Sequence, residues 1–209
     1  MSIAIVSSSI HDQDSFPTSV DCGSTANTNL YVGVLSRGVG SSCTGVTFNS
    51  VSLTKMGSIS SSTVGAGEEY SIWILLNASG NHTLDATFSG VATATRFSSY
   101  AFSGTDQVTG YEGYASQDHN SDTPTTISVT STRDNSFIWG YFPNGAGTLT
   151  ADSNTTFPDA TIYEAGYSTA AQTPAGSHAI GYTNNSVSVI QAVVVMPLLP
   201  NNGDFLMFM

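Results

Sequence analysis

The side chains best grouped for chemistry in this chain are oxygen ligands suited to a metal ion. A run Asp-His-Asn-Ser-Asp places Asp118, Asn120 and Asp122 at alternate positions, as at the start of a calcium-binding loop. Thr123 stands where such a loop has glycine, and Val129 stands where it has its last carboxylate. The motif is therefore half complete, and the sequence leaves open a Ca²⁺ site or a polar turn.

Carboxylates could also act as an acid and base pair, which glycoside hydrolysis requires. The candidates are Asp85, Asp106, Glu112 and Glu164, but no feature of the sequence pairs them. We expect them to be solvated surface groups, with Asp85 on the outward side of a strand. The chain also contains no H-E-x-x-H, G-x-S-x-G, phosphate-loop or Cys-x-x-Cys motif. The prediction is that the protein is not an enzyme.

Two other groups could bind or react. The run from His11 to Asp14 offers an imidazole and two carboxylates to a metal, and a polar loop is the alternative. Cys22 and Cys43 could form a disulfide bridge. Because we expect no export from a reducing compartment, two buried free thiols are the favoured interpretation.

Aromatic side chains near expected loops could form a platform for a sugar ring, since aromatic faces pack on apolar surfaces. The candidates for this platform are Tyr111, Tyr114, Tyr141 and Phe142. Trp73 and Trp139 lie within expected strands, so we assign both to the core.

The low charge of the chain excludes several classes of function. Only 9% of its residues are charged, four are Lys or Arg, and the formal net charge is −11. Nucleic-acid binding and attachment to anionic membranes need clustered basic residues, so we expect neither. No apolar run reaches the length of a transmembrane helix. The N-terminus lacks a basic region, so we also expect no secretory signal peptide.

Alternating and apolar runs bounded by Gly, Asn, Ser and Pro predict strands along most of the chain. The expected strands are 3–9, 29–36, 44–48, 51–57, 70–77, 82–89, 95–103, 125–131, 135–142, 160–168, 177–183 and 186–196. The strands 70–77 and 186–196 are apolar on both sides, and Asn49-Ser50 fits a tight hairpin. No helical period and no repeat of fixed length appears. The fold class predicted is all-β, a two-sheet antiparallel β-sandwich of the jelly-roll kind.

The predicted organisation is one domain with two flanking segments. Residues 1–28 are expected to form an N-terminal strand and an irregular arm, residues 29–199 the sandwich, and residues 200–209 a tail. The tail ends in five apolar residues, which would be costly to expose. We therefore expect it either to dock on a partner or to fold back on its own sandwich. The docking residues would be Phe205, Leu206, Met207, Phe208 and Met209.

Several segments together resemble a diffuse group of jelly-roll domains found in bacteriophage virion proteins and in some bacterial surface proteins. The resemblance covers about 29–199. It is carried, in order, by Leu30-Tyr-Val-Gly-Val, Val46-Thr-Phe, Leu53-Thr, Ser71-Ile-Trp-Ile-Leu, Asn81-His-Thr-Leu-Asp-Ala-Thr-Phe-Ser, Ser99-Tyr-Ala-Phe-Ser-Gly-Thr-Asp-Gln107 and Ile190-Gln-Ala-Val-Val-Val-Met-Pro. The group has no shared catalytic residues to carry over.

The resemblance implies a structural protein of the virion surface, made in the host cytoplasm, such as a capsid decoration or cement protein. Its partners would be a capsid or other virion protein and further copies of itself, for example in a trimer. The alternative is a carbohydrate-binding or receptor-binding module of a phage tail or a cell-surface adhesin.

Overall fold

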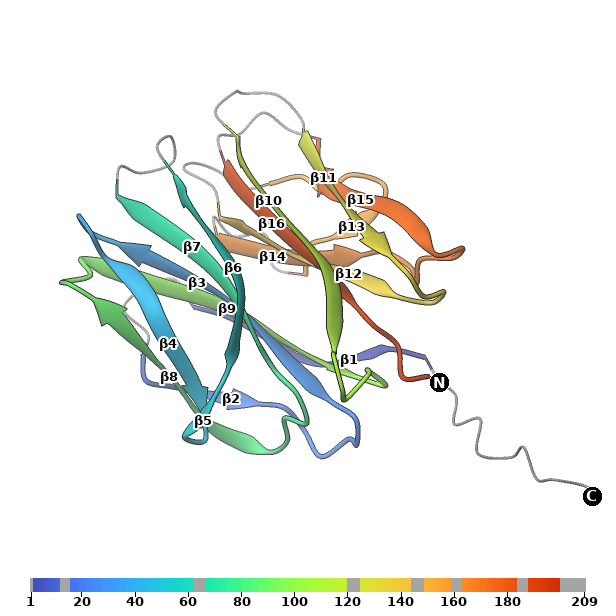
Figure 1. Ribbon diagram of the computed structural model, residues 1–209, viewed down its shortest axis with the longest axis horizontal. Helices are drawn as coiled ribbons and strands as arrows, with labels where there is room; N and C mark the ends of the chain where they lie inside the picture. The colour runs from blue at the N-terminus through green and yellow to red at the C-terminus, as the bar shows by residue number, and fades with distance from the viewer. Residues whose placement is uncertain are drawn as a thin grey trace, which may run out of the picture.

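The computed structural model describes residues 2–11, 16–61, 67–119, 125–143, 149–158, 163–183 and 188–199, and within them all regular structure is β (Figure 1). The strands are β1 (Ala4–His11), β2 (Thr18–Asp21), β3 (Asn29–Arg37), β4 (Ser42–Phe48), β5 (Val51–Ser52), β6 (Thr54–Ser61), β7 (Glu68–Leu75), β8 (Asn81–Ser89), β9 (Ala94–Ser103), β10 (Tyr111–His119), β11 (Thr125–Ser131), β12 (Phe137–Pro143), β13 (Thr155–Thr156), β14 (Tyr163–Ser168), β15 (Gly176–Tyr182) and β16 (Ser188–Val195).

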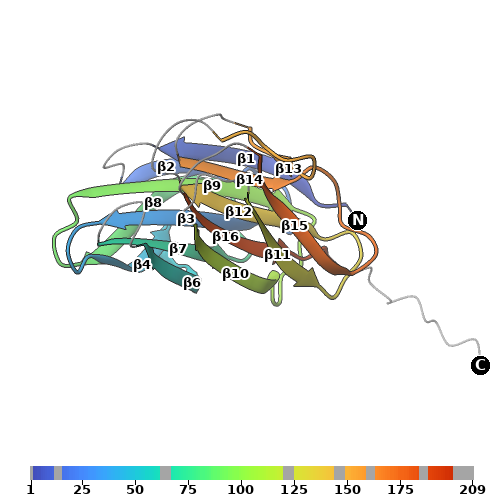
Figure 2. The same cartoon turned by 90° about the horizontal axis from the view of Figure 1, so that it is seen from above.

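The described strands form four antiparallel sheets that stack in layers (Figure 2). Two inner sheets have the orders β1-β9-β3-β7-β6 and β10-β16-β12-β14-β13. One outer sheet, β2-β8-β4-β5, covers the first inner sheet, and the pair β11-β15 covers the second. Each inner sheet is therefore packed on both faces, which explains why strands such as β3 are buried almost throughout.

Three apolar clusters fill the spaces between these layers. The central cluster lies between the inner sheets and contains Tyr31, Tyr100, Trp139 and Tyr141, all fully buried. A second cluster lies under the four-stranded outer sheet, and a third lies under the pair β11-β15. Burial of this much apolar surface is the main source of the fold's stability.

The two halves of the chain, β1–β9 and β10–β16, repeat one strand order. In each inner sheet, the first strand of the half (β1 or β10) pairs with the last strand of that half (β9 or β16). The last strand in turn pairs with the third (β3 or β12). In each outer sheet the second strand pairs with the next-to-last. Contacts across the centre are also reciprocal: Tyr100 Oη in β9 donates to Ala165 O in β14 at 3.2 Å, and Gln191 Nε2 in β16 donates to Tyr70 O in β7 at 3.3 Å. The halves thus pack like the two subunits of an isologous dimer.

The main difference between the halves is the hairpin of β4 and β5. It lies between β3 and β6 and extends the first outer sheet to four strands. At the corresponding place in the second half, described residues 149–154 make one isolated bridge, between Ala151 and Tyr182, and no strand. Among the described residues, the outer sheet of the first half therefore has two more strands than that of the second.

The prediction of an all-β antiparallel sandwich is confirmed, as are most of the expected strands. Asn49 and Ser50 both have positive φ and join the paired residues Phe48 and Val51, so the expected hairpin is present. The sheets number four rather than two, because apolar residues on both faces of the inner strands admit a covering layer on each side. Jelly-roll connectivity stays a prediction.

Three strands were not expected from the sequence. β2 lies within the stretch that was expected to be an irregular arm, and β10 and the two-residue β13 lie where no strand was expected. β2 pairs with β8 and β10 pairs with β16, both far away in the chain, whereas β13 pairs with its neighbour β14. The sequences of these strands are polar, so partners rather than local pattern define them as strands.

Candidate functional site

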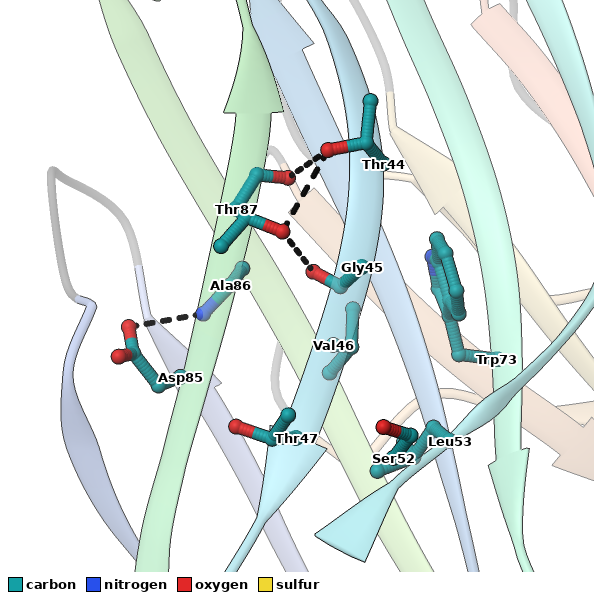
Figure 3. Close-up of a pocket in the computed structure, with 10 residues that line it drawn as sticks. All are labelled: Thr44, Gly45, Val46, Thr47, Ser52, Leu53, Trp73, Asp85, Ala86 and Thr87. Carbon is teal, nitrogen blue, oxygen red and sulfur yellow. Dashed lines mark hydrogen bonds between the residues drawn. The ribbon is translucent and has the colours of Figure 1, made fainter. Parts of the chain in front are cut away.

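The outward side of the first outer sheet presents a polar face built from hydroxyl groups around one carboxylate. Ser52, Thr47 and Asp85 lie opposite one another on β5, β4 and β8 (Figure 3). One row along, Gly45 lies opposite Thr87. Because successive residues of a strand face opposite sides, the same strands send Val46, Phe48 and Leu84 into the core. We call the outward residues Ser19, Thr44, Gly45, Thr47, Ser52, Thr83, Asp85 and Thr87 the polar face.

Two neighbouring hollows, of about 280 and 370 Å³, open on the polar face and share Thr47 and Asp85 in their walls. The first is bounded by Trp73 and Leu53 at its edge, and the second extends to Asn49 and Asn81. Gly45 keeps the first hollow open, since a Cβ at this position would lie 2.8 Å from Thr87 Oγ1.

Hydrogen bonds within the polar face fix some of its groups and leave others exposed. Thr44 Oγ1 donates to Thr87 O at 3.2 Å, and Thr87 Oγ1 donates to Gly45 O at 3.4 Å (Figure 3). Asp85 Oδ1 accepts from Ala86 N at 2.8 Å, and its other oxygen lies on an exposed side chain. The arrangement can offer a ligand hydroxyl groups, which both donate and accept, and a carboxylate, which accepts.

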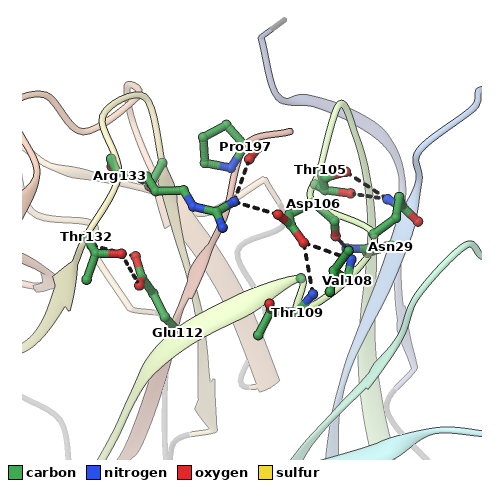
Figure 4. A network of polar contacts seen from close by, with 12 residues as sticks. Asn29, Thr105, Asp106, Val108, Thr109, Glu112, Thr132, Arg133 and Pro197 are labelled. Carbon is green, nitrogen blue, oxygen red and sulfur yellow. Dashed lines mark hydrogen bonds and ion pairs between the residues drawn. The ribbon is translucent and has the colours of Figure 1, made fainter. Parts of the chain in front are cut away.

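A second polar cluster joins the two halves at one end of the stack (Figure 4). Asp106, in the connection between β9 and β10, accepts from Arg133 Nη1 at 2.6 Å and from the backbone N–H groups of Val108 and Thr109. Arg133 Nη1 also donates to Pro197 O at 3.3 Å. Burial raises the pKa of the Asp106 carboxyl, but these donors and the Arg133 charge outweigh it and lower the pKa to about 2.

Asp106 corrects one expectation, because the sequence suggested a solvated carboxylate and this one is only 6% exposed. The prediction for Asp85 is confirmed, since it lies exposed on the outward side of β8. Glu112 accepts from Thr132 N and Thr132 Oγ1, which bind both of its oxygens (Figure 4). It also accepts from Ser131 Oγ at 3.2 Å. Glu164 lies in β14. Asp106 and Glu112 thus bind the adjacent residues Arg133 and Thr132, whereas Asp85 lies in the first outer sheet.

The expected calcium motif is described only at its first position. Asp118 lies in β10, where its Oδ1 accepts from Ser61 Oγ of β6 at 3.0 Å. Asn120 and Asp122 lie outside the described residues, as do Asp12 and Asp14 of the N-terminal motif. Among the residues that are described, no three His, Cys, Asp or Glu side chains are grouped closely enough to hold a metal ion.

The expected aromatic platform is wrong, because its members pack inside the molecule. Tyr141 and Phe142 are fully buried, on opposite faces of β12. Tyr111 and Tyr114 are half-buried against the central cluster, where Tyr114 Oη accepts from Gln191 Nε2 at 2.7 Å. These aromatic residues serve the core because β10 and β12 are strands of an inner sheet.

The assignment of Trp73 and Trp139 to the core is confirmed, since both are buried. Cys22 and Cys43 are also buried in the cluster under the outer sheet, and neither forms a disulfide. Burial raises the pKa of each thiol to about 12, with smaller contributions from neighbouring groups. Both are therefore neutral packing groups.

Sequence reasoning did not identify the polar face or Arg133 as features of interest. Period-two alternation could have grouped Asp85 with Thr83 and Thr87 on one side of β8. It could not have shown that β4 lies beside β8, with β5 on the far side of β4. The docking residues predicted in the tail, 205–209, lie outside the described residues.

Comparisons of the chain with protein-family models, curated proteins and solved structures gave no match. The structure contains no helix, in the ranges that it describes, of the length and apolar character needed to cross a membrane.

Proposed function

We propose that this protein is a structural, non-enzymatic component of a bacteriophage virion surface, of the decoration kind, which attaches through its apolar C-terminal segment. The observation that carries the proposal is the way the chain is fixed just before that segment. Asp106 N donates to Met196 O at 3.0 Å, and Leu198 N donates to Gly104 O at 2.8 Å. The last strand is thus tied to the connection between the halves, beside Arg133.

This fixation gives the segment that follows Leu199 a rigid base. The N-terminal end of the chain lies at the same end of the stack, since a Cβ on Gly104 would lie 2.4 Å from Ser2 O (Figures 1 and 2). An attachment arm on a rigid base loses less conformational entropy on binding than one on a flexible base. A hollow of about 520 Å³ lined by Arg133, Leu198 and Leu199 adjoins the base.

The acidic, layered β-architecture also supports a structural role. Inner sheets packed on both faces give a large core, and the net charge of −11 favours solubility before assembly. None of these features requires a reaction or a bound cofactor.

The test is the solution mass of the full chain and of a variant ending at Asp204, measured by light scattering. A full-length control with Phe205→Ser and Phe208→Ser separates apolar character from length. We expect a defined oligomer for the full chain and a smaller species for both variants. Folded monomers of all three would contradict assembly through the tail. Absence of the protein from purified virions, by mass spectrometry, would contradict the virion role.

A further inference from the structure

We infer that the polar face of the first half is a binding site for a neutral saccharide. This goes beyond an assembly role and does not depend on it. The site would be formed by Thr47, Ser52 and Asp85 in one row, with Thr87 and Thr83 beside them. The ligand would occupy the two adjoining hollows, which share Thr47 and Asp85 in their lining.

The chemistry of the described lining selects the class of ligand. It contains hydroxyl groups, the side-chain amides of Asn49 and Asn81, the His82 side chain and one carboxylate, without lysine or arginine. The nearby cation Lys55 is held at 2.9 Å by Glu69 and lies 5.5 Å from the centre of the Trp73 ring. A phosphate or other anion would meet no positive charge here. A sugar presents hydroxyl groups that donate to a carboxylate and exchange hydrogen bonds with Ser, Thr and Asn.

The groups needed for such bonds are available. No hydrogen bond among the described residues occupies the hydroxyl groups of Thr47 and Ser52, and both point to the same side as Asp85 (Figure 3). The hollows, of about 280 and 370 Å³, lie just below and just above the lower limit of ligand sites, about 300 Å³. Trp73, which is 4% exposed, adds an apolar boundary at the edge.

The internal duplication gives an independent reason to locate a site here. Residues 44–53 supply eight of the sixteen residues that line the two hollows, and they belong to the β4–β5 hairpin and its flanks. Among the described strands, β4 and β5 are the part of the first half that has no counterpart in the second. Among the described residues of the second half, the outer sheet contains β11 and β15, and residues 150–152 bond to the end of β15 without forming a strand.

The test uses the full chain on an array of neutral and acidic oligosaccharides, followed by calorimetric titration with the oligosaccharide retained best. Asp85→Asn and Thr47→Val remove acceptor and hydroxyl groups without changing strand length. Asp152→Asn removes one carboxylate from the second half as the matched control. We expect a neutral oligosaccharide to bind, each polar-face variant to weaken it about tenfold, and the control to bind as the unmodified protein does.

Thermal unfolding shows whether each variant is folded before its affinity is compared. Retention of no neutral oligosaccharide would overturn the inference. So would binding that both polar-face variants leave unchanged, or binding that selects acidic sugars. Because the assay uses isolated protein and the tail is intact, its outcome is independent of whether the protein assembles on a virion.

Discussion

Asp106 and Arg133 form an ion pair of 2.6 Å, with the carboxylate buried and the guanidinium partly buried, that fastens the two halves of the chain to each other. Asp106 belongs to the connection between the halves, whereas Arg133 follows β11 in the second half. Through Pro197 O, the same arginine holds the end of β16. The pair therefore controls both the junction of the halves and the base of the C-terminal segment.

Breaking this pair should destabilise the whole fold. Asp106→Asn leaves the Arg133 guanidinium partly buried without its carboxylate, which costs on the order of 3 kcal/mol in the free energy of unfolding. Chemical denaturation of the variant and of the exposed control Asp85→Asn measures this. A double-mutant cycle with Arg133→Met should give a coupling above about 1 kcal/mol. Additive effects would show that the two side chains act independently.

The pair should also make stability depend on pH. The Asp106 carboxyl has a pKa of about 2 in the folded protein against its usual 3.8. A lowered pKa means that the ionised form stabilises the fold above pH 4, and that this contribution is lost as the pH falls from about 4 to 2. The expected size is about 2 kcal/mol. Unfolding followed from pH 2 to 6 should show a shallower slope for Asp106→Asn, and an unchanged slope would contradict the prediction.

The contact between the inner sheets depends on the absence of a side chain at Gly33. A Cβ here would lie 2.5 Å from the Tyr141 ring, across the central cluster. Gly33→Ala should therefore lower the free energy of unfolding by about 1–3 kcal/mol through overpacking. The exposed substitution Ser52→Ala serves as the control and should change it by less than about 0.5 kcal/mol. If Gly33→Ala costs as much in a Tyr141→Leu background, the clash with the ring is not its cause.

The two buried thiols should resist modification in the folded protein. Burial raises the pKa of Cys22 and of Cys43 to about 12 from 9.0, so the reactive thiolate is scarce near pH 8. A chromogenic disulfide reagent should react slowly with native protein and promptly with two thiols in denaturant. Because a raised pKa stabilises the neutral form, the thiols' contribution to stability is lost as the pH rises above about 9. Fast reaction of native protein at pH 8 would contradict this.

The sequence predicted the strands of the core well because their pattern is local. Residues 70–77 and 186–196 are apolar on both sides, and both become strands of inner sheets buried on each face. The Asn49-Ser50 turn was also predicted, since two adjacent residues that tolerate positive φ suffice to define it. The alternation around Asp85 correctly put that side chain on the outward side.

Other features had no local signal. β10 has a polar sequence and becomes a strand because β16 pairs with it, and this placement moves Tyr111 and Tyr114 from an expected loop to the edge of the core. Asp106 could not be recognised as buried, because its partner Arg133 is 27 residues away. The repeated strand order of the two halves is likewise invisible as a repeat of fixed length.

By itself, the sequence determined that this protein is an all-β sandwich with a low charge and few basic residues. These properties follow from composition and from the period of two along each strand. Both are local, and neither depends on which other strand lies alongside. Only the tertiary structure decided that there are four layers, that Asp106 meets Arg133, and that Ser52, Thr47 and Asp85 form one row. Those relationships depend on which strands pair and in which register, and long-range pairing is selected by the packing of the whole chain.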